Sequence, residues 1–246
     1  MSRTYGQYCG LARALDLVGD RWNLLIVRQL LVAPARYREL LDGLPGVATN
    51  LLADRLRDLE TAGVIERRLA DEGNAIVYAL TPWGAELRSP IEGLIRWSTP
   101  LMARGPEGDR FCIEWLVVAL PALLARIAIA RRSSTVGIAV DGQLLDVRAT
   151  RSGIAVSLHD GRDLDAVVRA DPSIILGLAA GMLDLHQVLG LIEIDGDEDA
   201  VRALFGAERA DAGAPARQIT TRPPAPSDRR LGKRGFPSSA DVGGRA

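Results

Sequence analysis

The sequence predicts an α+β protein built from two folded segments and a tail. Residues 1 to 105 show short helical patterns that end in a pair of strand-like segments. Residues 134 to 206 change to short strands separated by Asp-Gly and Ser-Gly turns, followed by further helical patterns. Residues 207 to 246 are rich in Pro, Gly, Ala and Arg. We therefore expect folded segments over residues 1–104 and 109–206, and disorder over 207–246.

Charge is unevenly distributed along the 246 residues, although the formal net charge is only -1. Residues 1 to 105 hold 13 Arg and 12 acidic residues, whereas residues 106 to 206 hold 9 Arg and 15 acidic residues. The tail holds 8 basic and 4 acidic residues and is net positive. The middle of the chain is therefore a poor phosphate binder, and nucleic-acid contacts should come from the ends. For the tail itself, we favour a solvated segment over a DNA-binding arm.

The sequence does not indicate an exported, membrane-spanning or catalytic protein. Cys9 and Cys112 are too few for a disulfide framework and lack metal-ligand spacing, which favours a reducing cytoplasm. The apolar run from Ile113 to Ala130 is interrupted by charged residues and a proline and is shorter than the roughly 20 residues of a bilayer span, so we expect a buried helix. No phosphate loop, metal spacing or nucleophile motif is present, so we expect no enzyme activity, metal or cofactor.

Four helices and a hairpin are predicted in the first segment. Asp20 suits an N-cap, Pro45-Gly46 supplies a tight corner, and Gly63 ends the fourth helix. The helices are expected at Leu11–Val18, Arg21–Leu31, Tyr37–Leu44 and Ala48–Ala62, and the strands at Val64–Ala70 and Ala75–Leu80. This order describes a helix-turn-helix with a wing, which makes DNA the leading candidate partner.

The fourth helix has the pattern of a recognition helix. Its leucines share one face, whereas Asn50, Ala53, Asp54 and Arg57 point the opposite way at a period of 3.6. Asn50 could hydrogen-bond to adenine, Arg57 to guanine or a phosphate, and Asp54 to a cytosine amino group. The alternative for Asp54 is an ion pair with Arg57, three residues further along the helix. The predicted DNA-binding residues are Arg36, Arg38, Thr49, Asn50, Ala53, Asp54, Arg57, Arg67 and Arg68.

Periodicity alone leaves open an ordinary small domain with solvated arginines, because a fold pattern does not establish function. Several motifs in one order, however, resemble the HxlR-type winged-helix regulators over about residues 9 to 102. The resemblance implies a dimeric bacterial transcription factor. Ala48 stands where such proteins commonly carry Ser or Asn, so the cap of the fourth helix passes to Thr49 or is lost. The motifs are Ala14-Leu-Asp-Leu-Val-Gly-Asp-Arg-Trp22, Tyr37-Arg-Glu-Leu40, Leu44-Pro-Gly-Val47, Leu52-Ala-Asp-Arg-Leu-Arg-Asp-Leu-Glu60, Gly63-Val-Ile-Glu-Arg67 and Tyr78-Ala-Leu-Thr-Pro-Trp-Gly84.

The same resemblance aligns Cys9 with a cysteine that senses oxidants or electrophiles in some relatives. A reactive thiol needs a lowered pKa, and Cys9 precedes a helix and has Arg13 one turn on. Cysteine is also among the most buried residue types, so simple packing is the alternative. Cys9 is therefore a candidate redox sensor, conditional on its exposure.

A long helical segment closes the first folded segment. Thr81-Pro82 marks one helix start, and Ser89-Pro90-Ile91-Glu92 marks a second, with Ser89 as cap. The apolar seam that follows packs either on its own domain or on a second subunit, and we favour a homodimer because two-fold symmetry brings two recognition helices to adjacent major grooves. The seam consists of Leu87, Ile91, Leu94, Ser98 and Leu101.

The second segment is predicted as a mainly antiparallel sheet covered by helices, among them Pro172–Ala180 and Glu198–Phe205. Its later part is similar to sterol carrier protein 2-like (SCP2-like) lipid-binding domains in the runs Ala166-Val-Val-Arg-Ala-Asp-Pro172, Leu176-Gly-Leu-Ala-Ala-Gly181, Val188-Leu-Gly-Leu-Ile-Glu-Ile-Asp-Gly-Asp197 and Ala203-Leu-Phe205. The resemblance implies an apolar tunnel beneath the helices, whereas a filled core is the alternative. The predicted ligand-binding residues are Trp115, Leu116, Leu120, Ile174, Ile175, Leu178, Met182, Leu185, Val188 and Leu189.

Two functions from different classes are consistent with these patterns. The first is a homodimeric, DNA-binding transcriptional regulator that recognises a pseudo-palindromic operator and whose second segment senses an apolar small molecule. The second is a lipid carrier or scaffold whose winged helix mediates protein contacts. We favour the first. Its expected partners are double-stranded DNA, a second copy of the chain and an apolar effector, without a membrane.

Overall fold

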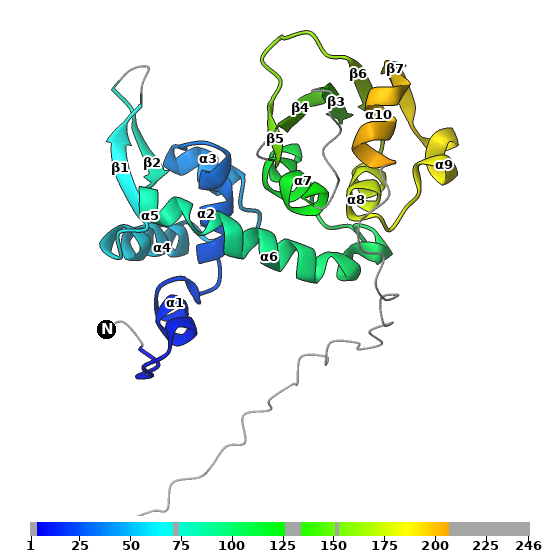
Figure 1. Cartoon of the computed structure of the whole chain (residues 1–246). Helices are drawn as coiled ribbons and strands as arrows, with labels where there is room; N and C mark the ends of the chain where they lie inside the picture. The colour runs from blue at the N-terminus through cyan, green and yellow to red at the C-terminus, as the bar shows by residue number, and fades with distance from the viewer. Residues whose placement is uncertain (1–3, 71–73, 126–133, 151–152, 207–246) are drawn as a thin grey trace, which may run out of the picture. The chain divides into compact units, whose positions relative to one another are not determined.

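The computed structural model describes residues 4–70, 74–125, 134–150 and 153–206. The predicted tail over 207–246 and the end of the helix predicted to reach Ala130 lie outside these ranges. No helix within the described ranges is long and apolar enough to cross a membrane. The first part of the chain contains the predicted helices: α1 (Gly10–Val18), α2 (Asn23–Val32), α3 (Tyr37–Asp42) and α4 (Thr49–Thr61) (Figure 1).

The start of α2 differs from the prediction. The helix begins at Asn23, and Trp22, not Asp20, occupies the N-cap position with a left-handed φ of 86°. A bulky residue adopts this conformation only where its surroundings impose it. Here the buried Asn23 donates from Nδ2 to the carbonyl oxygen of Leu17 at 2.9 Å, which ties the start of α2 to the end of α1. The Asp20 carboxylate is consequently free for another partner.

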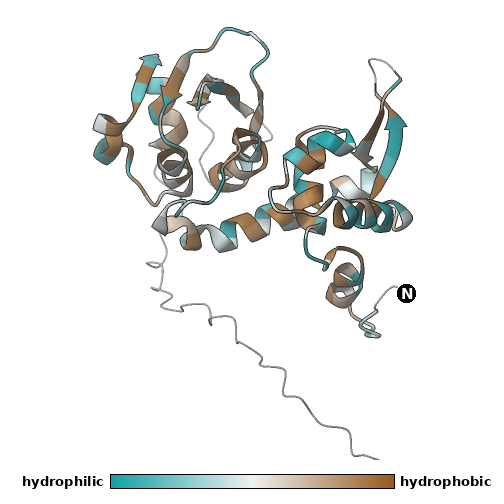
Figure 2. Cartoon of the chain, turned by 180° about the vertical axis from the view of Figure 1, so that it is seen from behind, coloured by the Kyte–Doolittle hydropathy of each residue, from teal (hydrophilic) through white to brown (hydrophobic). Residues whose placement is uncertain are grey.

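The wing is a two-stranded antiparallel hairpin of β1 (Ile65–Leu69) and β2 (Ile76–Leu80), as predicted. Ala35 extends it, because Ala35 and Tyr78 exchange backbone hydrogen bonds of 3.0 and 2.8 Å. Strand β1 is exposed beyond its first residue and carries mostly hydrophilic colours in Figure 2. The wing therefore rests on the domain at its base and offers β1 side chains to solvent.

Two short helices and a 3-10 segment follow the wing: α5 (Pro82–Ala85), α6 (Arg88–Ser98) and η1 (Thr99–Arg104). The helix start predicted at Thr81-Pro82 is confirmed, and the Thr81 hydroxyl caps it by accepting a hydrogen bond from the Gly84 N–H at 3.0 Å. The predicted cap at Ser89 is wrong. Helix α6 already starts at Arg88, and Pro90 falls in its first turn, where a missing N–H costs no helical hydrogen bond.

The second part of the chain is a five-stranded sheet with helices on one face. Its order is β5-β4-β3-β6-β7, with only the β3–β6 pair parallel. Helices α8 and α10 have the predicted bounds, and the mainly antiparallel α+β arrangement is as expected. The elements are η2 (Ile113–Trp115), α7 (Leu116–Leu124), β3 (Thr135–Val140), β4 (Gln143–Thr150), β5 (Gly153–Leu158), β6 (Ala166–Arg169), α8 (Pro172–Ala180), α9 (Leu185–Val188), η3 (Leu189–Leu191), β7 (Glu193–Gly196) and α10 (Glu198–Phe205).

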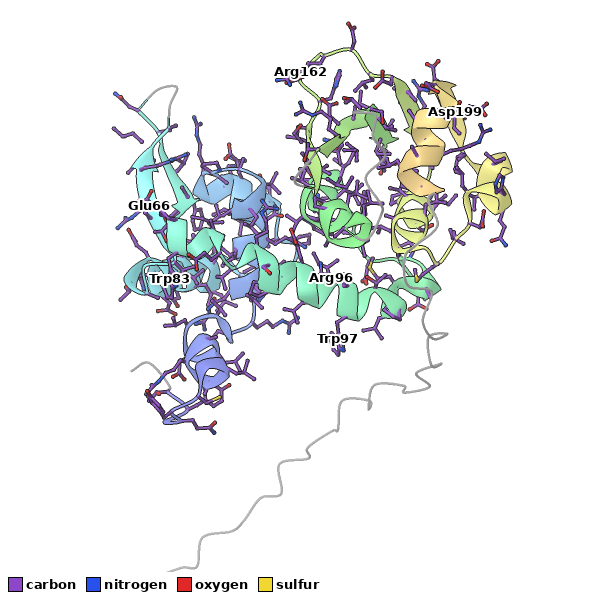
Figure 3. All side chains as sticks on the ribbon, in the orientation of Figure 1. Glu66, Trp83, Arg96, Trp97, Arg162 and Asp199 are labelled. Atoms are coloured by element: carbon purple, nitrogen blue, oxygen red, sulfur yellow. The ribbon has the colours of Figure 1, made fainter. Side chains whose placement is uncertain are left out.

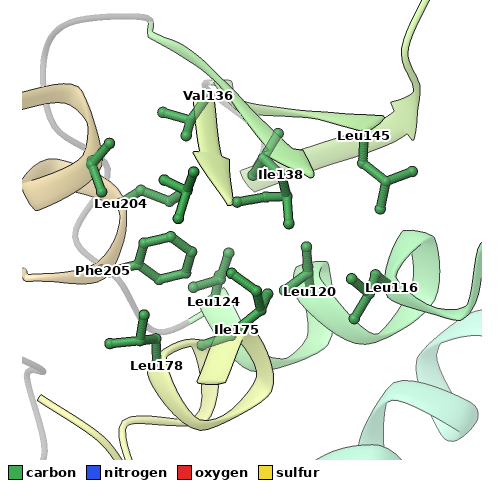
Figure 4. Close-up of a cluster of buried hydrophobic side chains, with 14 of the residues drawn as sticks. Leu116, Leu120, Leu124, Val136, Ile138, Leu145, Ile175, Leu178, Leu204 and Phe205 are labelled. Carbon is green, nitrogen blue, oxygen red and sulfur yellow. The ribbon is translucent and has the colours of Figure 1, made fainter. Parts of the chain in front are cut away.

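Helix α7 contributes to two hydrophobic cores. Leu116, Leu120 and Leu124 pack with the inward side chains of the sheet and with α8 and α10 (Figure 4). Val118 is fully buried in the core of the first part, with side chains of α2 and α4. A helix that is apolar on all sides must be covered on all sides, which explains why α7 lacks a polar face. The described residues up to 206 accordingly form one compact unit.

Candidate nucleic-acid interface

Helix α4 has the orientation that its sequence predicted. Leu52, Leu56 and Leu59 are buried in the core of the first part. Asn50, Asp54 and Arg57 are exposed, and Ala53 is half-buried among them. The polar face of α4 is thus available to a partner along its length.

The start of α4 is held by a neighbouring helix and lacks a side-chain cap. The Tyr37 hydroxyl, at the first residue of α3, donates to the carbonyl oxygen of Thr49 at 2.7 Å. Ala48 is the N-cap residue and offers no side-chain acceptor, so of the two expectations for this cap, its loss is the one observed. The first N–H groups of a 13-residue helix therefore remain without a side-chain acceptor, and they point toward the end that a phosphate would approach.

Arg55 is an important residue that the sequence reasoning missed. Its Nη1 lies 2.6 Å from Asp20 Oδ2 and 2.9 Å from Asp58 Oδ2, and its side chain is only 22% exposed. Asp20 belongs to the turn between α1 and α2, so this pair joins that turn to the recognition helix. The Arg55–Asp58 spacing of three residues was visible in the sequence, but the contact with Asp20 depends on the tertiary fold.

Asp54 and Arg57 form the intrahelical pair that was the alternative to base recognition. Arg57 Nη1 lies 3.0 Å from Asp54 Oδ1, with both side chains largely exposed. Such a solvated pair contributes little to stability, and DNA phosphates compete with the carboxylate for the arginine. Thr49 and Asn50, the first two residues of α4, are exposed polar side chains outside this pair.

The two wing arginines differ in their partners. Arg67 Nε donates to Glu60 Oε1 of α4 at 2.8 Å, and this hydrogen bond, with the carboxylate charge, raises the pKa of Arg67. Arg68 is exposed and has no ion pair within the described residues. The wing is therefore tied to the recognition helix through Arg67, whereas Arg68 is the free cation of the strand.

Arg36 and Arg38 flank the start of α3 and are exposed. Neither forms an ion pair with another described residue, although the Arg36 N–H donates to Glu39 Oε2 at 2.7 Å. Together with Arg68, they are the predicted DNA-binding arginines that no carboxylate neutralises in the described parts of the chain. Phosphate contacts are expected from these three side chains first.

The predicted seam on α6 is divided between two environments. Ile91 is buried in its own domain, and Leu87 packs against the same core. Leu94 and Leu101 are 47% and 62% exposed, and Trp97, which was not predicted, is 76% exposed and points away from the helix (Figure 3). The sequence spacing could not separate these groups, because the inward and outward stripes of this short helix are both apolar.

The N-terminal arm is attached to α1 by Asp16, which accepts hydrogen bonds from the Thr4 hydroxyl at 3.1 Å and the Tyr5 N–H at 2.8 Å. Cys9 follows in the arm and is exposed. Hydrogen bonds from the backbone N–H groups of Ala12 and Leu11 lower the pKa of the Cys9 thiol. Of the two expected causes, the start of the following helix therefore acts on the thiol, whereas Arg13 lies 3.5 Å from Asp16.

A shallow apolar hollow of about 270 Å³ lies between α1 and the α5–α6 segment. Sequence patterns did not predict it, because its lining residues come from three separate stretches of the chain. Its lining residues are Ala14, Leu17, Val18, Val64, Trp83, Gly84, Glu86, Leu87 and Pro90.

The predicted ligand-binding residues of the second part lie in different environments. Leu116, Leu120, Ile175, Leu178, Leu185 and Val188 are buried in one packed cluster, of which Figure 4 shows the first four. Trp115 and Ile174 are half-buried. Met182 and Leu189 are 41% and 46% exposed, so the expectation that they face the interior is wrong. Met182 lies just after α8, and Leu189 lies directly after α9.

The two histidines are not part of a metal cluster in the described ranges. His159 Nδ1 lies 2.7 Å from Oδ1 of Asp146, which is buried, so this imidazole has a hydrogen-bond partner.

Comparison with known proteins bears on the first part of the chain. A family model described as HxlR-like helix-turn-helix matches residues 17–105. The chain is 31% identical over 102 residues to the HTH-type transcriptional regulator YodB of Bacillus subtilis (strain 168), which covers 41% of this chain and 88% of YodB. It is 35% identical over 88 residues to the uncharacterized regulator YvaP of the same organism, or 35% of this chain and 82% of YvaP. The crystal structure of quinone-bound YodB from B. subtilis matches with 30% identity and a TM-score of 0.33, over 37% of this chain and 96% of that one.

The winged helix-turn-helix, its exposed recognition face and these relatives define a DNA-binding transcriptional regulator. Residues 106 to 246 lie beyond the region that the family model matches. Within that class, the chain belongs to the HxlR-like helix-turn-helix family.

Proposed function

We propose that the protein regulates transcription as a homodimer bound to a pseudo-palindromic operator. The observation that carries this proposal is the exposed polar face of α4, together with three exposed arginines, Arg36, Arg38 and Arg68, that form no ion pair with a carboxylate in the described residues. In this arrangement Asn50 contacts a base edge from α4, Arg57 contacts guanine or a phosphate, and Arg36, Arg38 and Arg68 contact phosphates. Arg67 places the wing beside the same groove through Glu60.

The homodimer is supported by exposed apolar side chains on the elements that border the DNA-binding core. Trp83 and Trp97 are 52% and 76% exposed, and Tyr8 and Leu11 of the arm and α1 are also exposed. Exposed large apolar side chains are typical of a protein interface, and two-fold symmetry would place two α4 helices about 34 Å apart, one turn of DNA.

The effector of this regulator is proposed to be an apolar small molecule bound by the second part of the chain. The five-stranded sheet covered on one face by α7, α8 and α10 is consistent with this. The resemblance of the sequence to SCP2-like domains is the second reason for the proposal. Cys9 is a second proposed input, because its thiol is exposed and its pKa is lowered. The quinone-bound form of YodB is consistent with small-molecule control in a relative. The protein has no catalytic role in this proposal and acts in the cytoplasm, where its DNA is.

DNA binding is tested by fluorescence anisotropy of the full-length protein with a labelled duplex from its own promoter and a scrambled duplex of equal length. We expect preference for the promoter, and an affinity that falls steeply with salt. The variants Arg38→Ala and Arg68→Ala should each reduce the slope of log K against log salt by about 0.9. Arg162→Ala, an exposed arginine of the second part (Figure 3), is the matched control and should leave the slope unchanged.

Equal affinity for both duplexes, with no dependence on salt, would contradict the proposal. A stoichiometric bound lipid in native mass spectrometry, together with unchanged partner binding in Arg57→Ala and Arg67→Ala, would instead support a lipid carrier or scaffold. Sedimentation of the wild type and of Trp97→Ser tests the dimer separately.

A further inference from the structure

Arg28 is a cation in an unusual position on α2, the central helix of the DNA-binding core. Its guanidinium carbon lies 4.2 Å from the ring centroid of Trp115, in η2. Within the described parts of the chain, Arg28 forms no ion pair. Both its Nε and Nε1 of Trp115 are buried, and neither has a hydrogen-bond acceptor among the residues that the structure describes. The Arg28–Trp115 contact therefore contains one positive charge and two N–H donors that lack an acceptor.

Buried charges and buried N–H groups normally have partners, because transfer from water is unfavourable without them. Burial lowers the pKa of Arg28 to about 10, and the only opposing influence comes from the neighbouring Cys112 thiol. The stacking of the guanidinium on the indole ring offsets part of this desolvation, but it uses the face of the ring and leaves both N–H donors unused. An acceptor is the missing component of this arrangement.

Apolar side chains border this contact, beside the Cys112 thiol. Phe111 packs edge-on against Trp115, with ring centroids 6.3 Å apart and an interplanar angle of 75°. Val32, one turn beyond Arg28 on α2, packs against both hydrophobic cores. A ligand here would meet one cation, two donors and aromatic or aliphatic walls.

We propose that Arg28 and Trp115 form a binding site for a small monocarboxylate with an aromatic or aliphatic body. A carboxylate brings one negative charge and two acceptor oxygens, which match one guanidinium and the two N–H donors. An inorganic phosphate carries more charge than a single arginine neutralises, and the apolar walls offer it no further donors. A cationic or neutral ligand would leave the arginine unpaired.

The location gives the ligand a means of regulation, and this part rests on the proposed function. Arg28 belongs to α2, whereas Trp115 immediately precedes α7, whose Val118 is buried in the DNA-binding core. A carboxylate that bridges Arg28 and Trp115 strengthens the contact between α2 and η2. It changes DNA affinity only if the bound and free forms of the contact differ in how they support α4.

Binding is tested without DNA, by calorimetry and tryptophan fluorescence of the full-length protein titrated with benzoate, octanoate and inorganic phosphate. We expect saturable binding of at least one carboxylate, weaker or no binding of phosphate, and loss of binding as the pH rises through about 10. Arg28→Met removes the charge but keeps the aliphatic stem, and should weaken carboxylate binding about tenfold or more. Trp115→Phe keeps an aromatic ring, removes the N–H donor, and should weaken binding severalfold.

Arg21→Met is the matched control, because Arg21 also stacks on a tryptophan, Trp22, at 5.6 Å, but is exposed. It should bind carboxylates like the wild type. Circular dichroism verifies that each variant folds, and Trp115→Phe decides the outcome if Arg28→Met does not fold. The proposal is overturned by absence of saturable carboxylate binding, by tighter binding of phosphate, or by equal effects of the Arg21 and Arg28 substitutions. None of these results depends on DNA binding, which the promoter titration tests independently.

Discussion

Replacement of Asp54 by Asn should strengthen DNA binding, because Asp54 holds Arg57 and repels phosphates. The side chains of the pair are 59% and 70% exposed, at 3.0 Å. An exposed pair contributes about 0.2–1 kcal/mol, so the substitution should lower the free energy of unfolding by no more than that. Removal of one negative charge near a phosphate is worth about 1 kcal/mol in water, or roughly a fivefold lower Kd. Release of Arg57 for one more phosphate should steepen the salt slope by about 0.9.

The assay is anisotropy with the promoter duplex over a series of salt concentrations, beside urea unfolding of each variant. Asp58→Asn is the control, because it makes the same change in net charge on the same helix but its partner is Arg55. It should leave the salt slope closer to the wild-type value. If Asp54→Asn changes neither Kd nor slope, or if Asp58→Asn has an equal effect, Asp54 does not control Arg57 at the DNA surface.

Three further predictions concern stability and thiol chemistry. Val118→Ala should lower the free energy of unfolding by about 2 kcal/mol, because the side chain is fully buried in the core of the first part. Urea unfolding measures this change, and an unchanged midpoint would show that α7 does not support that core. Thr81→Ala should cost about 1 kcal/mol, since the hydroxyl caps α5 and donates to Gly63 at 2.7 Å; thermal unfolding that matches the wild type would exclude this role. Cys9 should be alkylated at lower pH than Cys112, because backbone N–H groups lower the pKa of Cys9 whereas burial raises the pKa of Cys112. Mass spectrometry of the alkylated protein tests this. Modification of Cys112 before Cys9 would contradict Cys9 as the more reactive thiol.

Local patterns predicted the elements most reliably where start and stop signals lie within the element itself. Helix α8 has Pro172 in its first turn and ends at Gly181, whose φ of 64° suits glycine, and its bounds match the prediction. Helix α2 was misplaced because its start depends on Asn23, which hydrogen-bonds to a different helix. Pairing with a distant segment has no periodic signature in the sequence.

The sequence was sufficient to predict which side of α4 is exposed, but not which arginines of the candidate DNA-binding site form ion pairs. The leucines at 52, 56 and 59 define the buried side of α4, and the opposite side followed from helical geometry. The sequence did not predict which arginines lack an ion pair. Arg67 contacts Glu60, and Arg55 contacts Asp20, only once the hairpin and the α1–α2 turn have packed beside α4.

The sequence by itself determined the order of helices and strands, the polar face of α4 and the helix start at Thr81-Pro82, because hydrophobic period and capping act within one or two turns. Only the tertiary structure decided that α7 serves two cores, that α6 presents Trp97 outward, and that Arg28 meets Trp115. These features join segments far apart in the chain, and their energies come from burial and charge pairing that exist only once those segments have packed together.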